Sequence, residues 1–143
     1  ALKAGTAKRD ASRPKMDIQA GGMLAIDESL TGEDQQKVLD FARPSTALYV
    51  GGMGARGTNF HFEVFARMGY EDVALKVQDL YLAGKKDEAA ACIPLSMVED
   101  VALVGPIEKI RDDMAKWRES CITTFLVSGP PQVLSKYADI IHG

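Results

Sequence analysis

The chain has 143 residues, 46% hydrophobic and 26% charged, a composition typical of one folded globular domain rather than of a disordered or fibrous chain. Its formal net charge of −3, without a run of lysine or arginine, argues against a nucleic-acid partner. No apolar stretch reaches the roughly 18 residues that a membrane helix needs, and the basic first residues lack the apolar segment of a signal peptide. We therefore expect a cytoplasmic protein without a membrane or nucleic-acid partner.

The cysteines and histidines are isolated and predict no metal site. Cys92 and Cys121 stand apart without metal-ligand spacing, and His61 and His142 are too far apart in sequence to form a motif. The two cysteines are expected to be reduced thiols in or near the core.

The first elements are a helix end, a strand and a helix. Ala1–Ala4 has the pattern of a last helical turn that closes at Gly5, and a start of this kind without methionine indicates a processed or partial chain. The run Met16–Asp27 is short, apolar and interrupted by glycine, which predicts a buried strand. A helical stripe begins near Val38 and is expected to end at Pro44.

A glycine-rich segment follows and raises the question of a nucleotide site. Gly52, Gly54 and Gly57 fit the spacing G-x-G-x-x-G and come after the apolar stretch Thr46–Val50, a weaker candidate for a third strand. In the dinucleotide-binding fingerprint such glycines let backbone amides approach a pyrophosphate at a helix N-terminus. The fingerprint also requires a second strand with an acidic end about 20 residues later, whereas Tyr70–Leu82 has helical spacing.

The dinucleotide interpretation is therefore disfavoured, because the acidic candidates Asp72 and Asp79 fall on the predicted helix. A strand at this place would instead support a Rossmann-type nucleotide binder. Two other interpretations remain: a structural loop between helices, or a flexible loop that faces a ligand. In the second, the loop amides and Arg56 offer donors and a cation to an anionic group.

The last part of the chain predicts helices around one further strand. Short helices are expected at Asp87 and after Pro94, and a longer helix at Pro106. Ile122–Val127 is a short β-branched strand, and a final helix ends at Gly143. The long helix has an apolar face made of Ile107, Ile110, Met114 and Trp117. Two firm strands cannot shield both faces of a sheet, so the pattern indicates a helix-rich piece of a larger α/β fold.

Four segments, in order along the chain, resemble the luciferase-like monooxygenase superfamily, and most closely its actinobacterial branch of deazaflavin (coenzyme F420)-dependent oxidoreductases. The longest is ALYVGGMGARGTNFHFEVFARMGYEDVALKVQDLYLAGKKDEAA. AGTAKRDASRPKMDI resembles the "AGR-D-P" turn before the seventh barrel strand. LVGPIEKIRDDMAKW resembles the "VGTPEEV" helix entry, and SCITTFLV resembles the closing strand "AGVTTLLL".

The resemblance implies that residues 1–143 form a single segment, the C-terminal portion of a (β/α)₈ TIM barrel. It would supply the last two barrel strands, with a helical insertion or lid over residues 26–106 between them. The first six strands, with much of the flavin pocket, would lie in the remainder of the barrel. Departures from the family pattern occur at Ser120–Cys121, in place of Ala-Gly, at His61, where an aromatic such as Tyr is common, and at Gly105–Pro106, which drops a Thr.

The resemblance also implies a site in the connection that begins at Ile26–Ser29, at the carboxyl end of the seventh strand. This lid loop would contact cofactor or substrate and close over a hydride-transfer site. Its candidate binding residues are Gly52, Gly54, Arg56, Gly57, Asn59 and His61. Ser128 and Gly129, after the last strand, are a candidate phosphate loop. No residue stands out as a catalytic acid or base.

The expected function is hydride transfer between reduced coenzyme F420 and a small organic substrate, with the segment alone inactive. One alternative is an FMN-dependent monooxygenase that uses molecular oxygen, since the lid need not distinguish the two rings. Another is a non-catalytic helical fragment or binding module. Expected partners are the small-molecule substrate, the remainder of the barrel and a second copy in a homodimer.

Overall fold

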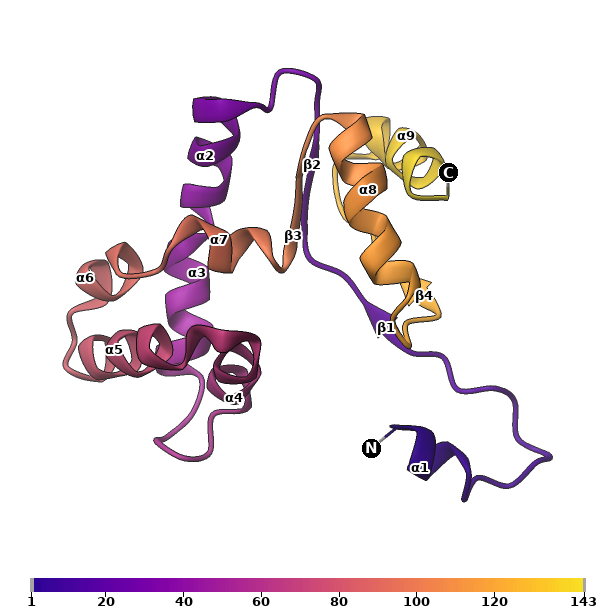
Figure 1. The fold of residues 1–143 in the computed structure, drawn as a ribbon, viewed down its shortest axis with the longest axis horizontal. Coiled ribbons are helices and arrows are strands. Elements are labelled where there is room, and N and C mark those ends of the chain that lie inside the picture. Colours follow the sequence, from indigo (N-terminus) through magenta and orange to yellow (C-terminus); the bar gives the residue numbers. More distant parts are fainter. Residues whose placement is uncertain (1, 143) are drawn as a thin grey trace.

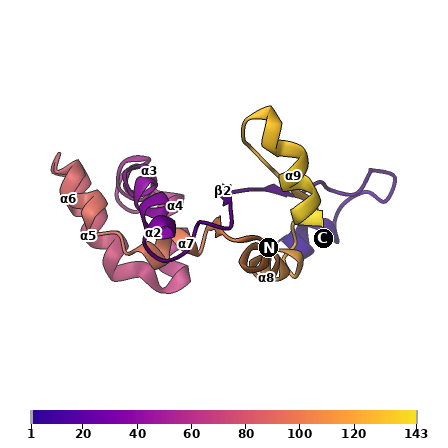
Figure 2. The same ribbon diagram turned by 90° about the horizontal axis from the view of Figure 1, so that it is seen from above.

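A computed structural model describes residues 2–142 and divides them into two lobes joined by a pair of strands (Figure 1). The helical lobe, residues 32–99, holds α2–α7. The strand lobe holds β1 and β4 with α8 and α9, the strands β2 and β3 lie between the lobes, and Figure 2 shows the two lobes on opposite sides of β2. The elements are α1 (Leu2–Thr6), β1 (Gln19–Ala20), β2 (Met23–Ile26), α2 (Gly32–Phe41), α3 (Arg43–Ala47), the π-helix η1 (Leu48–Gly52), α4 (Phe60–Phe65), the π-helix η2 (Ala66–Tyr70), α5 (Glu71–Leu82), α6 (Lys86–Ala91), α7 (Leu95–Glu99), β3 (Ala102–Gly105), α8 (Ile107–Arg118), β4 (Thr124–Phe125) and α9 (Pro131–His142).

All the strand pairings in the described chain are parallel. β1 pairs with β4, with Gln19 opposite Thr124, and β2 pairs with β3, with Met23 opposite Ala102. The paired strands β2 and β3 are joined through the helices α2–α7, and α8 lies between β3 and β4 in the chain, so helical connections lie between the members of each parallel pair. The predicted α/β class, rich in helix and poor in strand, is confirmed.

The predicted strand Met16–Asp27 exists but is broken in the middle. Gly21 and Gly22 separate β1 from β2. At both positions the backbone of another segment, at Leu126 and at Val101, lies too close to leave room for a side chain. A Cβ on Gly21 would lie 2.6 Å from the backbone oxygen of Leu126. The predicted strand Ile122–Val127 is shorter than expected, since only β4 is regular.

Two predictions about strands are wrong. Thr46–Val50 is helical, in α3 and η1, because Ala47 and Val50 are fully buried in the helical lobe, and tertiary packing overrides the β-branched propensity. β3 was not predicted, and it lies inside the stretch 26–106 that was expected to be helical. The predicted cap at Asp87 is also wrong, because α6 begins after Lys85.

β3 was missed because both of its faces are buried. Ala102 and Val104 belong to the core of the helical lobe, whereas Leu103 belongs to the core of the strand lobe. Side chains alternate across a strand, so a strand between two cores is apolar at every position and has no alternation to detect. β2 divides its side chains in the same way, with Ala25 on one side and Ile26 on the other.

Several helices confirm their predictions. α5 covers most of the predicted helix and ends at Leu82, two residues before Gly84, whose φ of 81° favours glycine. On α8 the predicted apolar face meets the core, with Ile110 0% and Met114 4% exposed. The Trp117 ring packs edge-on against the Phe125 ring, with 5.1 Å between the ring centroids. The predicted end of the last helix at Gly143 lies outside the described residues.

Candidate functional site

The glycine loop joins η1 to α4 at the outer end of the helical lobe (Figure 1). Its glycines have structural causes. A Cβ on Gly51 would lie 2.5 Å from Tyr81 Cβ, and one on Gly54 would lie 2.9 Å from Asn59 Cα. Gly57 has a φ of 76°, in the left-handed region. A helix rather than a strand precedes the loop, and beyond α4 the helix α5 stands where the fingerprint needs a second strand, so the loop does not have the context of a dinucleotide-binding turn.

Asn59 holds the loop together from inside. It is 2% exposed, and its Nδ2 donates to the carbonyl oxygens of Tyr49 (2.9 Å) and Val50 (2.8 Å). Its Oδ1 accepts hydrogen bonds from the backbone amides of His61 (3.0 Å) and Phe62 (3.3 Å), which caps α4. Both amide donors and the acceptor are thus used within the protein, so the side chain pins the end of η1 to the start of α4.

Arg56 extends from the same loop toward α5. Its guanidinium forms an ion pair with Asp79, and both side chains are more than half exposed. An exposed pair of this kind contributes little to stability. The guanidinium therefore remains accessible to an anion at the molecular surface, although Asp79 already neutralises part of its charge.

His61 lies beside a hollow of about 390 Å³ between the helical lobe and the broken strand. The His61 ring contacts the rings of Tyr49, at a centroid distance of 4.7 Å, and Phe60, at 3.9 Å. The hollow is lined by Gly21, Gly22, Met23, Ala42, Ser45, Thr46, Tyr49, His61, Val64, Phe65, Val98, Val101 and Ala102. Among the predicted site residues only His61 lines it, and no single sequence motif pointed to it because its lining comes from separate segments.

Ser128 and Gly129 are not near the glycine loop in the fold. They follow β4 in the strand lobe, whereas the loop ends the helical lobe. Both residues are exposed, and a Cβ on Gly129 would lie 3.2 Å from Val133 Cγ2, so glycine permits α9 to pack closely. The first turn of α9 carries no acidic residue, so nothing there opposes a bound anion.

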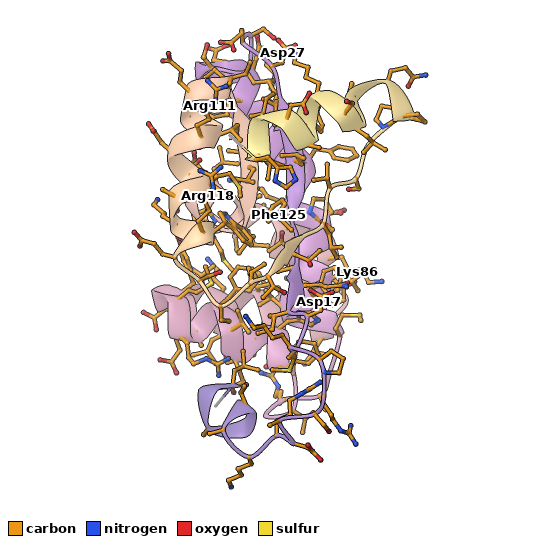
Figure 3. All side chains as sticks on the ribbon, turned by 90° about the vertical axis from the view of Figure 1, so that its right-hand side faces the viewer. Asp17, Asp27, Lys86, Arg111, Arg118 and Phe125 are labelled. Atoms are coloured by element: carbon orange, nitrogen blue, oxygen red, sulfur yellow. The ribbon has the colours of Figure 1, made fainter. Side chains whose placement is uncertain are left out.

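The two ends of the β1–β2 segment carry aspartates with different surroundings, visible at its opposite ends in Figure 3. At the carboxyl end, Asp27 accepts from the hydroxyl (2.7 Å) and amide (2.9 Å) of Ser29. These bonds, with a smaller contribution from Lys136, lower the pKa of Asp27. At the amino end, hydrogen bonds from Gln19, Thr124 and Thr123 lower the pKa of Asp17. Both carboxylates are therefore held in the charged form.

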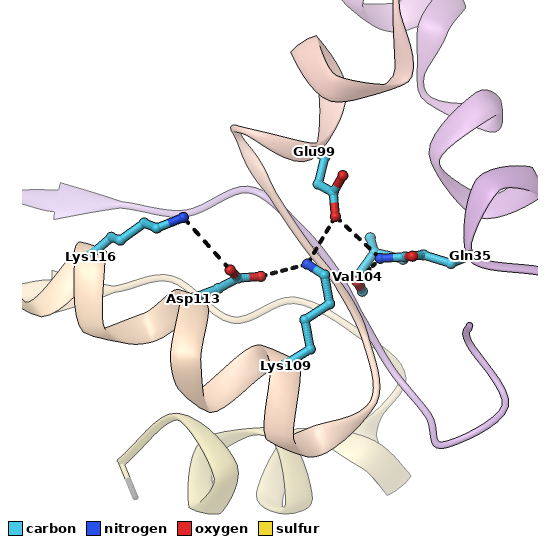
Figure 4. Close-up of polar contacts among 6 residues, drawn as sticks. All are labelled: Gln35, Glu99, Val104, Lys109, Asp113 and Lys116. Atoms are coloured by element: carbon cyan, nitrogen blue, oxygen red, sulfur yellow. Dashed lines mark hydrogen bonds and ion pairs between the residues drawn. The ribbon is translucent and has the colours of Figure 1, made fainter. Parts of the chain in front are cut away.

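A polar cluster that the sequence did not predict connects the lobes next to β3 (Figure 4). Lys109 of α8 pairs with Glu99 of α7 (3.0 Å) and with Asp113 (2.6 Å). Gln35 of α2 donates to Glu99 (3.3 Å) and to the carbonyl oxygen of Val104 (2.9 Å). Burial lowers the pKa of Lys109, but its bonds to Asp113 and Glu99 outweigh that effect and leave the pKa raised. The cluster ties three helices to one strand.

Over residues 2–142 there is no group of three or more histidine, cysteine or acidic side chains placed to hold a metal ion. Within the same range, none of the helices is both long enough and apolar enough to cross a membrane.

Comparison with known proteins gives one family and one relative. The family described as "Luciferase-like monooxygenase" matches residues 1–124. A Mycobacterium tuberculosis protein named "Putative coenzyme F420-dependent oxidoreductase" is 38% identical over 127 residues, which cover 89% of this chain and 36% of that protein. The chain thus spans about a third of the relative's length. No solved structure matches the chain.

Proposed function

The chain belongs to the luciferase-like monooxygenase family, and from that membership we propose that it is part of an oxidoreductase that transfers a hydride between reduced coenzyme F420 and a small organic substrate. The observation that carries this proposal is the 38% identity, over nearly the whole chain, to a relative whose name gives that cofactor.

The proposal assigns the chain to the C-terminal portion of a TIM barrel. Parallel strands joined through helices support it, because a barrel of this kind is built from such units. A barrel needs eight strands, so the proposal requires the remainder of the barrel beside β1–β4. A second copy in a homodimer is a further expectation.

The protein's own groups would bind the anionic part of the cofactor. The loop Ser128–Gly129 fits such a group, since it is exposed and precedes a helix of 12 residues without an acid in its first turn. Lys136, in the same helix, is near enough to Asp27 to affect its pKa and supplies a cation on this side. When bound, the deazaflavin ring would supply the hydride chemistry.

The glycine loop is the proposed lid. Gly57, with a φ of 76°, lets its backbone turn, Gly52 and Gly54 belong to the proposed contact surface of the same loop, and Arg56 offers an exposed cation. Asn59 takes a positioning role, because its hydrogen bonds fix the loop to α4. His61 faces the hollow. Closing of this loop would exclude water from the reacting groups.

A second candidate function is an FMN-dependent monooxygenase. The family's own description as a monooxygenase favours it, and it uses the same barrel and the same loops.

Titration of the natural protein with F420 and with FMN, followed by the fluorescence of each, tests the proposal. We expect F420 to bind more tightly than FMN, and Gly129→Asp to weaken F420 binding about ten-fold or more, because it adds a negative charge at the anion site. Gly5→Asp, at an exposed position with open space around it, is the matched control. Tighter binding of FMN would favour the monooxygenase, and binding of neither would remove the enzyme assignment.

A further inference from the structure

The hollow beside His61 combines apolar walls with a small number of unused hydrogen-bonding groups. Met23, Phe65 and Val98 supply apolar surface from a strand and two helices, and Phe65 and Val98 are themselves almost fully buried. The backbone of Gly21 and Gly22 lines it without side chains, where the β1–β2 segment breaks. A volume of about 390 Å³ lies in the range of small-molecule sites.

Most polar side chains that line the hollow are already occupied. The hydroxyls of Ser45 (2.8 Å) and Thr46 (3.0 Å) both donate to the carbonyl oxygen of Ala42. In residues 2–142 the imidazole of His61 and the hydroxyl of Tyr49 make no hydrogen bond, although both residues line the hollow and their rings are in contact. The available donors therefore come together on one wall.

The large apolar side chains at this wall are exposed to solvent, whereas large apolar side chains are usually buried. Tyr49 is 44% and Val64 38% exposed, and both line the hollow, whereas Phe60, 67% exposed, lies beside it against the His61 ring. Rings on both sides hold the imidazole between them. An apolar ligand seated here would cover this surface, and a polar atom on it would meet His61 and Tyr49.

We propose that this hollow is a binding site for a small, flat, apolar molecule that carries one hydrogen-bond-accepting oxygen, such as an aromatic ketone. The walls bind the ring by burial of apolar surface, and His61 and Tyr49 donate to the oxygen. The site shares His61 with the lid of the proposed function, but it is formed by residues of the described chain and its binding requires no cofactor.

Ligand-observed NMR titrations with acetophenone and with toluene, with no cofactor added, test the site. Acetophenone should bind at least about five-fold more tightly than toluene, the effect of one net hydrogen bond. His61→Phe keeps an aromatic ring and removes the donor, so acetophenone binding should weaken about five- to ten-fold while toluene binding changes less than about two-fold. His142→Phe, the same substitution at an exposed site on α9, should change neither.

Two further variants fill the hollow from different helices, so that one remains informative if the other fails to fold. Val64→Trp and Ser45→Phe both change exposed side chains at its edge, and each should abolish binding of both probes. Equal affinity for the two probes, an unchanged affinity in His61→Phe, or binding that survives a folded filling variant would overturn the proposal. These readouts do not use F420, so they are separate from the test of the oxidoreductase function.

Discussion

The two lobes differ in the size of their hydrophobic cores and in the amount of apolar surface that they expose. The helical lobe has a core cluster of 12 buried residues, two of them from β3, whereas the strand lobe has a cluster of six. Yet nine of the eleven exposed large hydrophobic residues in the described chain lie on the helical lobe, and only Leu126 lies on the strand lobe. The lobe with the larger core is therefore also the lobe with more exposed apolar side chains.

The comparison shows that a larger buried core does not go together with a less apolar surface. Apart from α2 and α5, the α-helices of the helical lobe have five or six residues, and the hollow is lined by residues of several of them. The strand lobe places two longer helices, α8 and α9, against its strands and leaves little apolar surface uncovered. The proposed role of the glycine loop as a lid would use such exposed surface.

The largest expected effect on stability comes from a cavity in the core of the helical lobe, with unfolding followed through a residue in the core of the strand lobe. Ile93→Ala removes a fully buried side chain of the helical lobe and should lower the free energy of unfolding by about 2–5 kcal/mol. Because β3 packs into both cores, we expect the lobes to unfold together. The fluorescence of Trp117, the single tryptophan, reports the strand lobe in a urea titration.

Ile110→Ala is the matched variant in the strand lobe. Both variants should shift the Trp117 transition to lower urea. If Ile93→Ala leaves that transition in place, the lobes unfold independently and the shared strand does not couple them.

A smaller effect is expected at Asn59, within the helical lobe. Asn59→Ala leaves the carbonyl oxygens of Tyr49 and Val50 without their partner and removes the α4 cap, which should destabilise the protein by about 2–3 kcal/mol. Asn59→Asp keeps the cap acceptor but places a buried carboxylate oxygen against the same two carbonyl oxygens, so its loss should be at least as large as that of Asn59→Ala. Equal melting temperatures for the wild type and Asn59→Ala would show that these bonds contribute nothing.

The smallest effect is expected at Asp17 in the strand lobe, where it appears as a pH dependence. Hydrogen bonds lower the pKa of Asp17 in the folded state, so its contribution is present above the unfolded pKa of about 3.9 and is lost as the pH falls through the lower, folded pKa. Thermal unfolding between pH 7 and pH 2 should therefore show a steeper acid loss in the wild type than in Asp17→Asn. Asp112→Asn, an exposed acid on α8, is the control and should keep the wild-type slope.

The elements that could be predicted are those with one buried face. The spacing of Ile110 and Met114 gives α8 because only one side of that helix meets the core. β3 could not be predicted by pattern, because Leu103 and Val104 are buried on opposite sides. Thr46–Val50 has strand propensity, but its surroundings impose a helix.

The site was predictable only in part for a related reason. The glycine loop is a local motif, so its position is visible in the sequence, but the cause of each glycine is a contact with Tyr81 or Asn59 that depends on the fold. The hollow has no local signature, because Gly22, Ala42, His61 and Val98 meet only after folding. The cluster around Lys109 joins residues from four elements, so no local sequence pattern could predict it.

Because the side chains of β3 are divided between two cores, the strand should not tolerate insertions or deletions of single residues. A deletion or insertion of one codon within Ala102–Gly105 would turn every following side chain of the strand to the opposite face. Val104 would then face the core that Leu103 now fills, and both lobes would lose their packing in a single step. The exposed loop around Gly57 has no such constraint from pleating, so changes of length during evolution should accumulate there and spare the strand.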